Sequence, residues 1–232
     1  MKVGIMQPYF LPYIGYFQLI AAVDTFVVYD RIKYTKKGWI NRNRMLRGTE
    51  AATFSLPLAQ GSDSLHICER ELAQSFDRNK LLNQFHEAYR QAPHFDATFA
   101  RLQKIILFES GNLFEYLHHS ITVICEYLGI ATRLIKSSDV AIEPELKGQD
   151  KVLAICEALS ASDYLNPIGG VELYSRQAFG ERDVDLAFLQ AQPVEYAQFG
   201  EAFIPWLSIV DVMMFNSAET ISTQILPAYK LI

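Results

Sequence analysis

The first 29 residues constrain the fold most, because they predict a strand, a helix and a second strand in immediate succession. Residues 2–6 are short and apolar and end at Gln7-Pro8, which predicts a first strand. The apolar and aromatic segment 13–23 predicts a buried helix, and the β-branched and aromatic segment 25–29 predicts a second strand. Two strands joined by such a crossover are expected to be parallel neighbours in one sheet.

The alternation of strands and helices continues along the chain. Strands are predicted at 52–58, 131–135, 162–167 and 184–189, and helices at 77–92, 95–109, 112–128, 150–159 and 205–217. This pattern predicts an α/β fold with a mainly parallel sheet flanked by helices and a helical middle section. We expect one α/β domain over residues 1–232, in which 77–129 forms a helical insertion or subdomain.

Three polar segments are expected to meet at one edge of this sheet. Segments 7–16, 30–43 and 166–174 each follow a predicted strand. Ligands of parallel α/β sheets bind outside the carboxyl ends of the strands. The sequence therefore predicts one binding site, built from these three segments.

The segment after the first strand combines rigid and polar residues. Pro8 and Pro12 restrict the backbone, Gly15 permits a close approach, and Gln7 offers an amide at the strand end. In the third segment, Gly169 and Gly170 can direct backbone N–H groups at an anion, although such a pair also marks simple turns. The candidate binding residues of these two segments are Gln7, Tyr13, Gly15, Tyr16, Asn166, Gly169 and Gly170.

The middle of the predicted site is strongly basic in an acidic protein. Residues 31–47 carry seven basic residues and no acidic one, whereas the rest of the chain holds 14 Lys and Arg against 26 Asp and Glu. The seven are Arg31, Lys33, Lys36, Lys37, Arg42, Arg44 and Arg47. Like charges repel one another, so the stretch is expected to surround an anion or to extend into water.

The residue types of this stretch indicate particular contacts with a ligand. Lys36 and Lys37 suit phosphate as point charges, and Arg42 suits phosphate or carboxylate as a bidentate clamp. Aromatic rings can stack on a base or sugar ring, and side-chain amides can bond to sugar hydroxyls. The candidate ligand-binding residues of these types are Tyr34, Trp39, Asn41 and Asn43.

Two readings of this segment stay open. Asp30 is either a general base or a cap or ion-pair partner of Arg31. The segment itself is either a ligand site or a solvated loop anchored by Trp39. Arg44 and Arg47 are expected to face solvent.

Composition narrows the function classes. Half of the residues are hydrophobic and 20% are charged, which is typical of a globular protein. Three widely spaced cysteines without a C-x-x-C pair suggest neither a disulfide framework nor a zinc site, so we expect no metal and a cytoplasmic location. No apolar run predicts a membrane span.

Asp211 is a charged residue within an apolar segment. Its carboxyl is expected to lie in a cleft or to be paired, for example with Ser208 or a basic residue.

These segments resemble the WbqC-like protein family over nearly the whole chain. The resemblance is carried by QPYFLPYIGYF at 7–17, KYTKKGWINRNR at 33–44, YLNPIGG at 164–170 and FIPWLSIVD at 203–211. Members of this family are typically associated with genes for surface polysaccharide (O-antigen) synthesis. The resemblance implies attachment of an aminoacyl or acyl group to the amine of a sugar.

The start of the chain is also similar in layout to the nucleotidyltransferase-like group, which includes adenylate-forming ligases. That similarity implies a Rossmann-like fold and makes ATP a candidate cofactor. The group carries a His-x-Gly-His motif where this chain has Tyr13-Ile14-Gly15-Tyr16. Neutral tyrosines do not supply the charge of histidines, so nucleotidyl transfer would require Lys36, Lys37 and Arg42 to stabilise the phosphate.

The favoured hypothesis is an enzyme of amino-sugar biosynthesis that binds a nucleotide or nucleotide-sugar, with Asp30, Lys36 and Lys37 as catalytic residues. The alternative is a non-catalytic sugar-binding or scaffold protein of polysaccharide assembly. A nucleic-acid partner is disfavoured, because the pI is about 5.6 and a 17-residue patch is a small footprint for a polyanion. The expected partner is a small molecule, and the sequence leaves the oligomeric state open.

Overall fold

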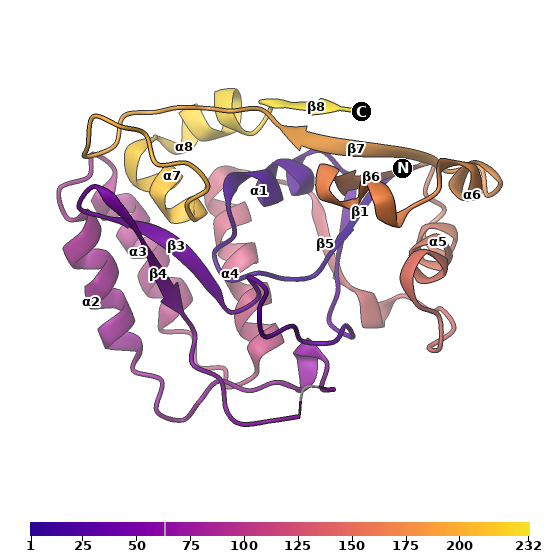
Figure 1. The fold of residues 1–232 in the computed structure, drawn as a ribbon, viewed down its shortest axis with the longest axis horizontal. Coiled ribbons are helices and arrows are strands. Elements are labelled where there is room, and N and C mark those ends of the chain that lie inside the picture. Colours follow the sequence, from indigo (N-terminus) through magenta and orange to yellow (C-terminus); the bar gives the residue numbers. More distant parts are fainter. Residues whose placement is uncertain (63) are drawn as a thin grey trace.

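A computed structural model describes residues 1–62 and 64–232 of the chain. Its main element is a six-stranded sheet in the order β5-β2-β1-β6-β7-β8, in which all neighbours pair in parallel except β7 and β8. The strands are β1 (Lys2–Met6), β2 (Thr25–Val28), β5 (Arg133–Lys136), β6 (Asp163–Pro167), β7 (Asp185–Ala191) and β8 (Tyr229–Leu231). The predicted α/β fold with a mainly parallel sheet is confirmed (Figure 1).

The predicted strand–helix–strand start is also confirmed. Helix α1 (Ile14–Ala21) connects β1 to β2, whose residues pair in parallel from Val3 with Thr25 to Met6 with Val28. The sheet is covered on both faces, which explains why these strands are apolar throughout. Helices α1 and α4 (Leu113–Leu128) pack on one face, and α5 (Gly148–Ala158) and α6 (Arg176–Gly180) pack on the other.

The helical middle section consists of α2 (Arg78–Tyr89), α3 (Phe95–Ile106) and α4. Asn112 caps α4 by accepting a hydrogen bond from the Glu115 N–H, and Gly129 ends it with a φ of 67°. Apolar residues of these helices share one continuous core with α1 and with α7 (Ile209–Phe215). The treatment of 77–129 as a separate insertion or subdomain stays a prediction.

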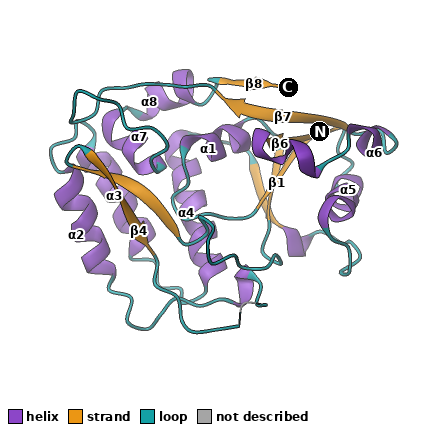
Figure 2. Ribbon diagram, in the orientation of Figure 1, coloured by secondary structure: helices purple, strands orange, loops and turns teal. Residues whose placement is uncertain are grey.

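The strand expected at 52–58 lies outside the main sheet. It is β4 (Glu50–Ser55), and it pairs antiparallel with β3 (Arg42–Arg47), which the sequence analysis did not predict. In β3, Asn43 and Met45 are buried and Arg44 between them is only half-buried, as alternation along a strand requires, but Leu46 is buried as well, so the alternation ends there. Figure 2 shows this hairpin beside α2, which β3 contacts, and apart from the six-stranded sheet.

The last third of the chain differs from prediction in two places. The helix expected at 205–217 begins only at Ile209, because Ser208 caps it and Trp206 has a φ of 60°, which no α-helix contains. Beyond it, α8 (Ala218–Thr220) and a π-helical turn (Ile221–Ile225) lead to β8, an unpredicted antiparallel edge strand. Within residues 1–62 and 64–232, no helix combines the length and apolar composition needed to cross a bilayer.

Candidate functional site

The winding of the sheet reverses between β1 and β6, and the crevice expected outside the carboxyl ends of these two strands is the candidate site. From β1 the chain winds outward to β2 and β5 in one direction and to β6 and β7 in the other. Ligands of such sheets bind at the carboxyl ends of the strands where the winding direction reverses. Gln7 follows β1 and the pair Gly169-Gly170 follows β6, so these candidates flank the reversal point.

The β6 side of this crevice is built by a tight backbone approach. Asn166 is buried, and its Nδ2 donates a hydrogen bond to Tyr164 Oη at 2.6 Å. A Cβ atom on Gly170 would lie 2.1 Å from Asn166 Oδ1, whereas one on Gly169 would meet nothing within 4 Å. Glycine is therefore required at 170 by packing, while Gly169 is exposed and has free space around it.

The β1 side is lined by tyrosines. Gln7 Nε2 donates to Tyr9 Oη at 2.7 Å, and Tyr16 Oη donates to the Gln7 carbonyl at 3.2 Å. The ring of Tyr13 covers Gly15, where a Cβ atom would lie 2.4 Å from it. Burial raises the pKa of Tyr9, Tyr13 and Tyr16, so these groups act as neutral hydrogen-bonding groups.

Asp30 joins the ends of β2 and β5. Its Oδ1 accepts hydrogen bonds from Ser137 Oγ at 2.6 Å and from the Ser138 N–H at 3.0 Å. Burial raises the pKa of Asp30, but these hydrogen bonds together outweigh burial and hold the pKa below its ordinary value of 3.8. Asp30 is therefore ionised at neutral pH and weakly basic, and its role as a general base stays a prediction.

We expect Asp30 to make folding pH-dependent in acid. A carboxyl whose pKa is lower in the folded than in the unfolded state stabilises the fold above its unfolded pKa, and this contribution is lost as pH falls through the folded pKa. Asp30→Asn should remove that dependence. Urea unfolding of both proteins, from neutral pH to below 3.8, measures it. Parallel pH curves for the two proteins would contradict the prediction.

The basic segment is held in shape by its own polar residues. Tyr34 is buried and donates to Asn41 Oδ1 at 2.8 Å, and Asn41 Nδ2 donates to the Leu56 carbonyl at 2.8 Å. Arg42 donates to the carbonyls of Gly38 at 3.0 Å and Lys37 at 2.8 Å. The side chains of Tyr34, Asn41 and Arg42 are therefore bonded to other groups of the protein. Their contact with a ligand stays a prediction.

The lysines and the tryptophan of the segment lie on its surface. Lys33, Lys36 and Lys37 are exposed, and Trp39 is 48% exposed. The guanidinium carbons of Arg42 and Arg44 lie 5.6 and 6.0 Å from the centre of the Trp39 ring. The exposed cations fit the predicted anion-binding role.

Asn43 connects this segment to the loop after β1. It is buried, and its Nδ2 donates to the Leu11 carbonyl at 2.8 Å while its Oδ1 accepts from the Arg44 N–H at 2.8 Å. Arg44 was expected from the sequence to face solvent. In the structure it is partly buried, and its guanidinium donates to the Trp206 carbonyl at 3.0 Å. Arg47 is exposed, as expected.

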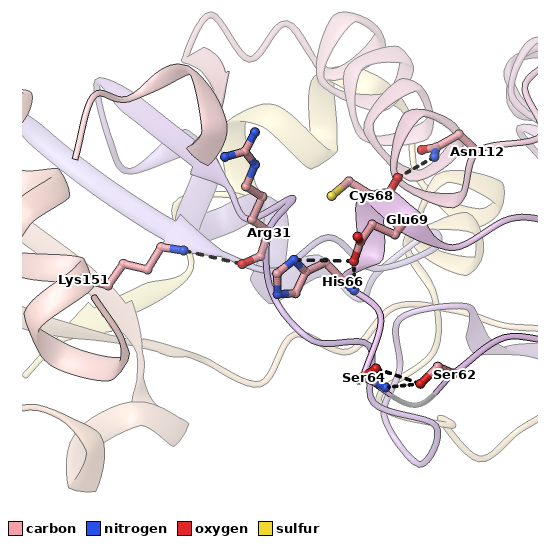
Figure 3. A network of polar contacts seen from close by, with 8 residues as sticks. All are labelled: Arg31, Ser62, Ser64, His66, Cys68, Glu69, Asn112 and Lys151. Atoms are coloured by element: carbon pink, nitrogen blue, oxygen red, sulfur yellow. Dashed lines mark hydrogen bonds and ion pairs between the residues drawn. The ribbon is translucent and has the colours of Figure 1, made fainter. Parts of the chain in front are cut away.

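Lys151, which was not among the residues predicted from the sequence, reaches the same edge from α5. Its Nζ lies 3.5 Å from the Arg31 carbonyl oxygen and 5.4 Å from the centre of the Tyr29 ring (Figure 3). A lysine in the first turn of a helix opposes the helix dipole. That unfavourable position was the signal in the sequence. Figure 3 also places Cys68 and His66 beside Arg31.

Two other features bear on the chemistry of the site. Among the residues that the structure describes, no group of three His, Cys, Asp or Glu side chains is placed to hold a metal ion. A cavity of about 560 Å³ lies at the opposite edge of the sheet, lined by residues before β2 and β5 that include Val23, Asp24 and Thr132. It is therefore separate from the crevice at the carboxyl edge.

Comparison with known proteins identifies a family. The profile of the WbqC-like protein family matches residues 7–223. The chain is 31% identical over 223 residues to the uncharacterized protein Rv1507c of Mycobacterium tuberculosis (strain ATCC 25618 / H37Rv), covering 94% of this chain and 95% of that protein. No solved structure matches the chain.

Proposed function

This chain belongs to the WbqC-like protein family, and we propose that it is an enzyme of surface-polysaccharide biosynthesis. It binds a nucleotide or nucleotide-sugar at the carboxyl edge of its sheet and transfers an aminoacyl or acyl group to an amine of the sugar. One observation carries the proposal. The winding of the sheet reverses between β1 and β6, and the exposed lysines of the 31–47 segment follow the neighbouring strand β2 at the same edge of the sheet. The association of this family with O-antigen gene clusters supports the choice of a sugar substrate.

In this proposal, cationic groups and backbone amides bind the phosphates. Lys36 and Lys37 reach them from the segment after β2, and Lys151 reaches them from α5. The peptide groups around Gly169 supply further N–H donors from the β6 side. Gln7 orients a hydroxyl from the end of β1. Asn41, Arg42 and Asn43 also hold the binding segment in place through hydrogen bonds to backbone carbonyls, beside the ligand contacts predicted for them.

Acyl transfer to an amine requires the site to remove one proton. The sugar amine forms a bond to the acyl carbon, the bond from that carbon to the leaving group breaks, and the nitrogen releases one proton to a general base, the role predicted for Asp30. If ATP activates the acid, the carboxylate of the acid attacks the α-phosphorus of ATP and displaces pyrophosphate. The amine then attacks the acyl carbon and displaces AMP. Developing negative charge on the phosphate or carbonyl oxygen is stabilised by fixed cations, which is the role proposed for Lys36 and Lys37.

Calorimetric titration tests the proposal. We expect binding of a nucleotide-sugar or of ATP, and a Lys36→Ala/Lys37→Ala double variant should bind at least about tenfold more weakly, since a tenfold loss corresponds to roughly 1.4 kcal/mol. Lys2→Ala is the matched control, because Lys2 is exposed at the opposite edge of the sheet. Normal binding by the double variant, or no binding by the native protein, would remove the proposal.

The second candidate function is sugar binding without catalysis, as part of a polysaccharide assembly complex. The observation that favours it is the exposure of Trp206, a large aromatic ring that is 65% exposed and can pack against the face of a sugar ring. An assay with a sugar-nucleotide, an amino acid and ATP separates the two candidates. Covalently altered sugar in that assay excludes the second candidate, and its absence despite tight sugar binding favours it.

A further inference from the structure

Both tryptophans of the chain lie at the surface. Trp39 is 48% exposed and Trp206 is 65% exposed, and the chain has no other tryptophan. A large aromatic ring is normally mostly buried, because its burial stabilises the fold more than that of any smaller side chain. Two exposed rings in one protein therefore call for an explanation that core packing does not supply.

The two rings belong to one continuous surface. Arg44 lies between them, because its Nη2 donates to the Trp206 carbonyl at 3.0 Å and its guanidinium carbon is 6.0 Å from the centre of the Trp39 ring. On the other side, the rings of Trp206 and Tyr13 have centres 5.9 Å apart. We call Tyr13, Trp39, Arg44 and Trp206 the tryptophan surface.

Buried hydrogen bonds fix the three segments that carry this surface. Ser208 Oγ and Asn43 Nδ2 both donate to the Leu11 carbonyl, at 2.7 and 2.8 Å. The Ser208 N–H donates to the Arg44 carbonyl at 2.8 Å. Ser208 is completely buried and Asn43 nearly so. The surface is therefore held in one arrangement before any ligand arrives, which lowers the entropy lost on binding.

The backbone at Trp206 is strained. Its φ is 60°, a region that costs a residue with a Cβ atom free energy and is usually occupied by glycine or asparagine. The exposed ring gains little from burial in return. Strained residues that persist at a surface are typical of binding sites, where the side chain must point in one direction.

We propose that the tryptophan surface is a sugar subsite that binds a pyranose ring carrying an anionic group, either a carboxylate or a phosphate. Aromatic faces pack against the C–H face of a sugar ring, and an arginine fork matches an anion with two hydrogen bonds. Arg44 has N–H donors beyond the one that Trp206 accepts. The charge held within this surface is positive, which selects an anionic ligand over a neutral one.

The subsite adjoins the crevice of the proposed function, on which the identity of the ligand as a sugar rests. Tyr13 comes directly before α1, and its ring lies against Gly15, which is followed by Tyr16, whose hydroxyl donates to the Gln7 carbonyl at the end of β1. A sugar on the tryptophan surface is therefore directed along this loop toward the point where the strand order reverses.

Intrinsic tryptophan fluorescence reports on this surface directly, because it holds both tryptophans of the chain. The native protein, Trp39→Phe and Trp206→Phe are titrated with trigalacturonate, with a hexose 1-phosphate and with neutral maltotriose. We expect saturable fluorescence changes from both single-tryptophan proteins with at least one of the anionic sugars, at affinities at least about tenfold above that for maltotriose. The first two probes show whether a carboxylate or a phosphate is recognised. Equal affinity for the neutral and anionic sugars, or no change with any, overturns the proposal.

Variants separate recognition from folding. Arg44→Gln should weaken binding of the anionic sugar at least about tenfold, whereas Arg47→Gln, at the exposed end of the same strand, should not change it. Trp206→Gly should lose binding, read from Trp39, while its thermal midpoint stays at or above that of Trp206→Ala because glycine tolerates the φ of 60°. Unchanged titrations for Arg44→Gln and Trp206→Gly overturn the proposal.

The two proposals fail independently. If the Lys36→Ala/Lys37→Ala variant loses binding of nucleotide alone and keeps the fluorescence response to the anionic sugar, the crevice and the tryptophan surface are distinct subsites, as proposed. If nucleotide binds normally to the native protein while no sugar alters the fluorescence, the subsite is wrong and the proposed function stands.

Discussion

Replacing Asp211 with alanine is expected to destabilise the protein by about 3–5 kcal/mol, because it leaves buried donors without their acceptor. Asp211 is completely buried in α7 and accepts three hydrogen bonds. They come from Tyr89 Oη at 2.9 Å, Tyr196 Oη at 2.7 Å and Gln198 Nε2 at 2.7 Å. The carboxyl therefore joins α2, α7 and the irregular segment before Trp206. Urea unfolding at neutral pH measures the loss.

The control is Asp211→Asn, which keeps the shape of the side chain and one acceptor oxygen and should destabilise the protein less than the alanine variant.

The stability difference between the native protein and Asp211→Asn should also depend on pH. Burial raises the pKa of Asp211, and the bonds from Tyr196, Gln198 and Tyr89 limit the rise. A raised folded pKa stabilises the fold fully below the unfolded pKa, and that contribution is lost as pH rises through the folded pKa. The advantage of the native protein over Asp211→Asn should therefore shrink over that interval. A loss below about 1 kcal/mol for Asp211→Ala would contradict this account.

The partners of Asp211 also show what sequence patterns miss. Its apolar surroundings correctly predicted a partner for the carboxyl. Ser208, named as one candidate, instead caps α7 and bonds to the Leu11 carbonyl. The actual donors lie 13 to 122 residues away, on segments whose approach depends on the whole fold. Periodicity reports which face of a helix is buried, and it carries no information on which distant side chain meets that face.

The elements that were predicted correctly are those fixed by local patterning. The strands at the start of the chain and helix α4 follow from apolar runs and from Asn112 and Gly129 at the helix ends. Strand β3 was missed because its first buried position is the polar Asn43 and because Met45 and Leu46 are both buried, so apolar and polar residues do not alternate along it. The edge strand β8 has three residues and no pattern long enough to be recognised.

The order of the polar segments along the strands was predicted more accurately than the contacts of their side chains. The polar segments do follow strands β1, β2 and β6, because chain topology alone requires it. Side-chain direction follows from packing, and Asn41 and Asn43 turn inward to satisfy backbone carbonyls that the loops leave unpaired. Residue type showed that these amides form hydrogen bonds, without showing whether the partner is a ligand or the protein.

Gly170→Ala is expected to destabilise the protein by about 2–3 kcal/mol, because the new methyl group would overlap a fixed buried side chain. Its Cβ atom would lie 2.1 Å from Asn166 Oδ1. Asn166 cannot move freely, since its Nδ2 donates to Tyr164 Oη at 2.6 Å and the Tyr164 ring stacks on Phe179 with centres 5.3 Å apart. Gly169→Ala is the matched control and should change stability by less than about 0.5 kcal/mol, because its Cβ atom meets nothing within 4 Å.

A double-mutant cycle with Asn166→Ala isolates the contact. Asn166→Ala removes the oxygen that the new methyl group would meet, so Gly170→Ala should cost less than about 0.5 kcal/mol in that background. The coupling would show that Asn166 and Gly170 set the path of the loop after β6 together. Equal losses from the Gly169 and Gly170 substitutions, or no coupling in the cycle, would mean that this contact does not determine the loop. In the coupled case, Gly170→Ala should also weaken nucleotide binding more than Gly169→Ala, since it displaces the backbone that lines the crevice.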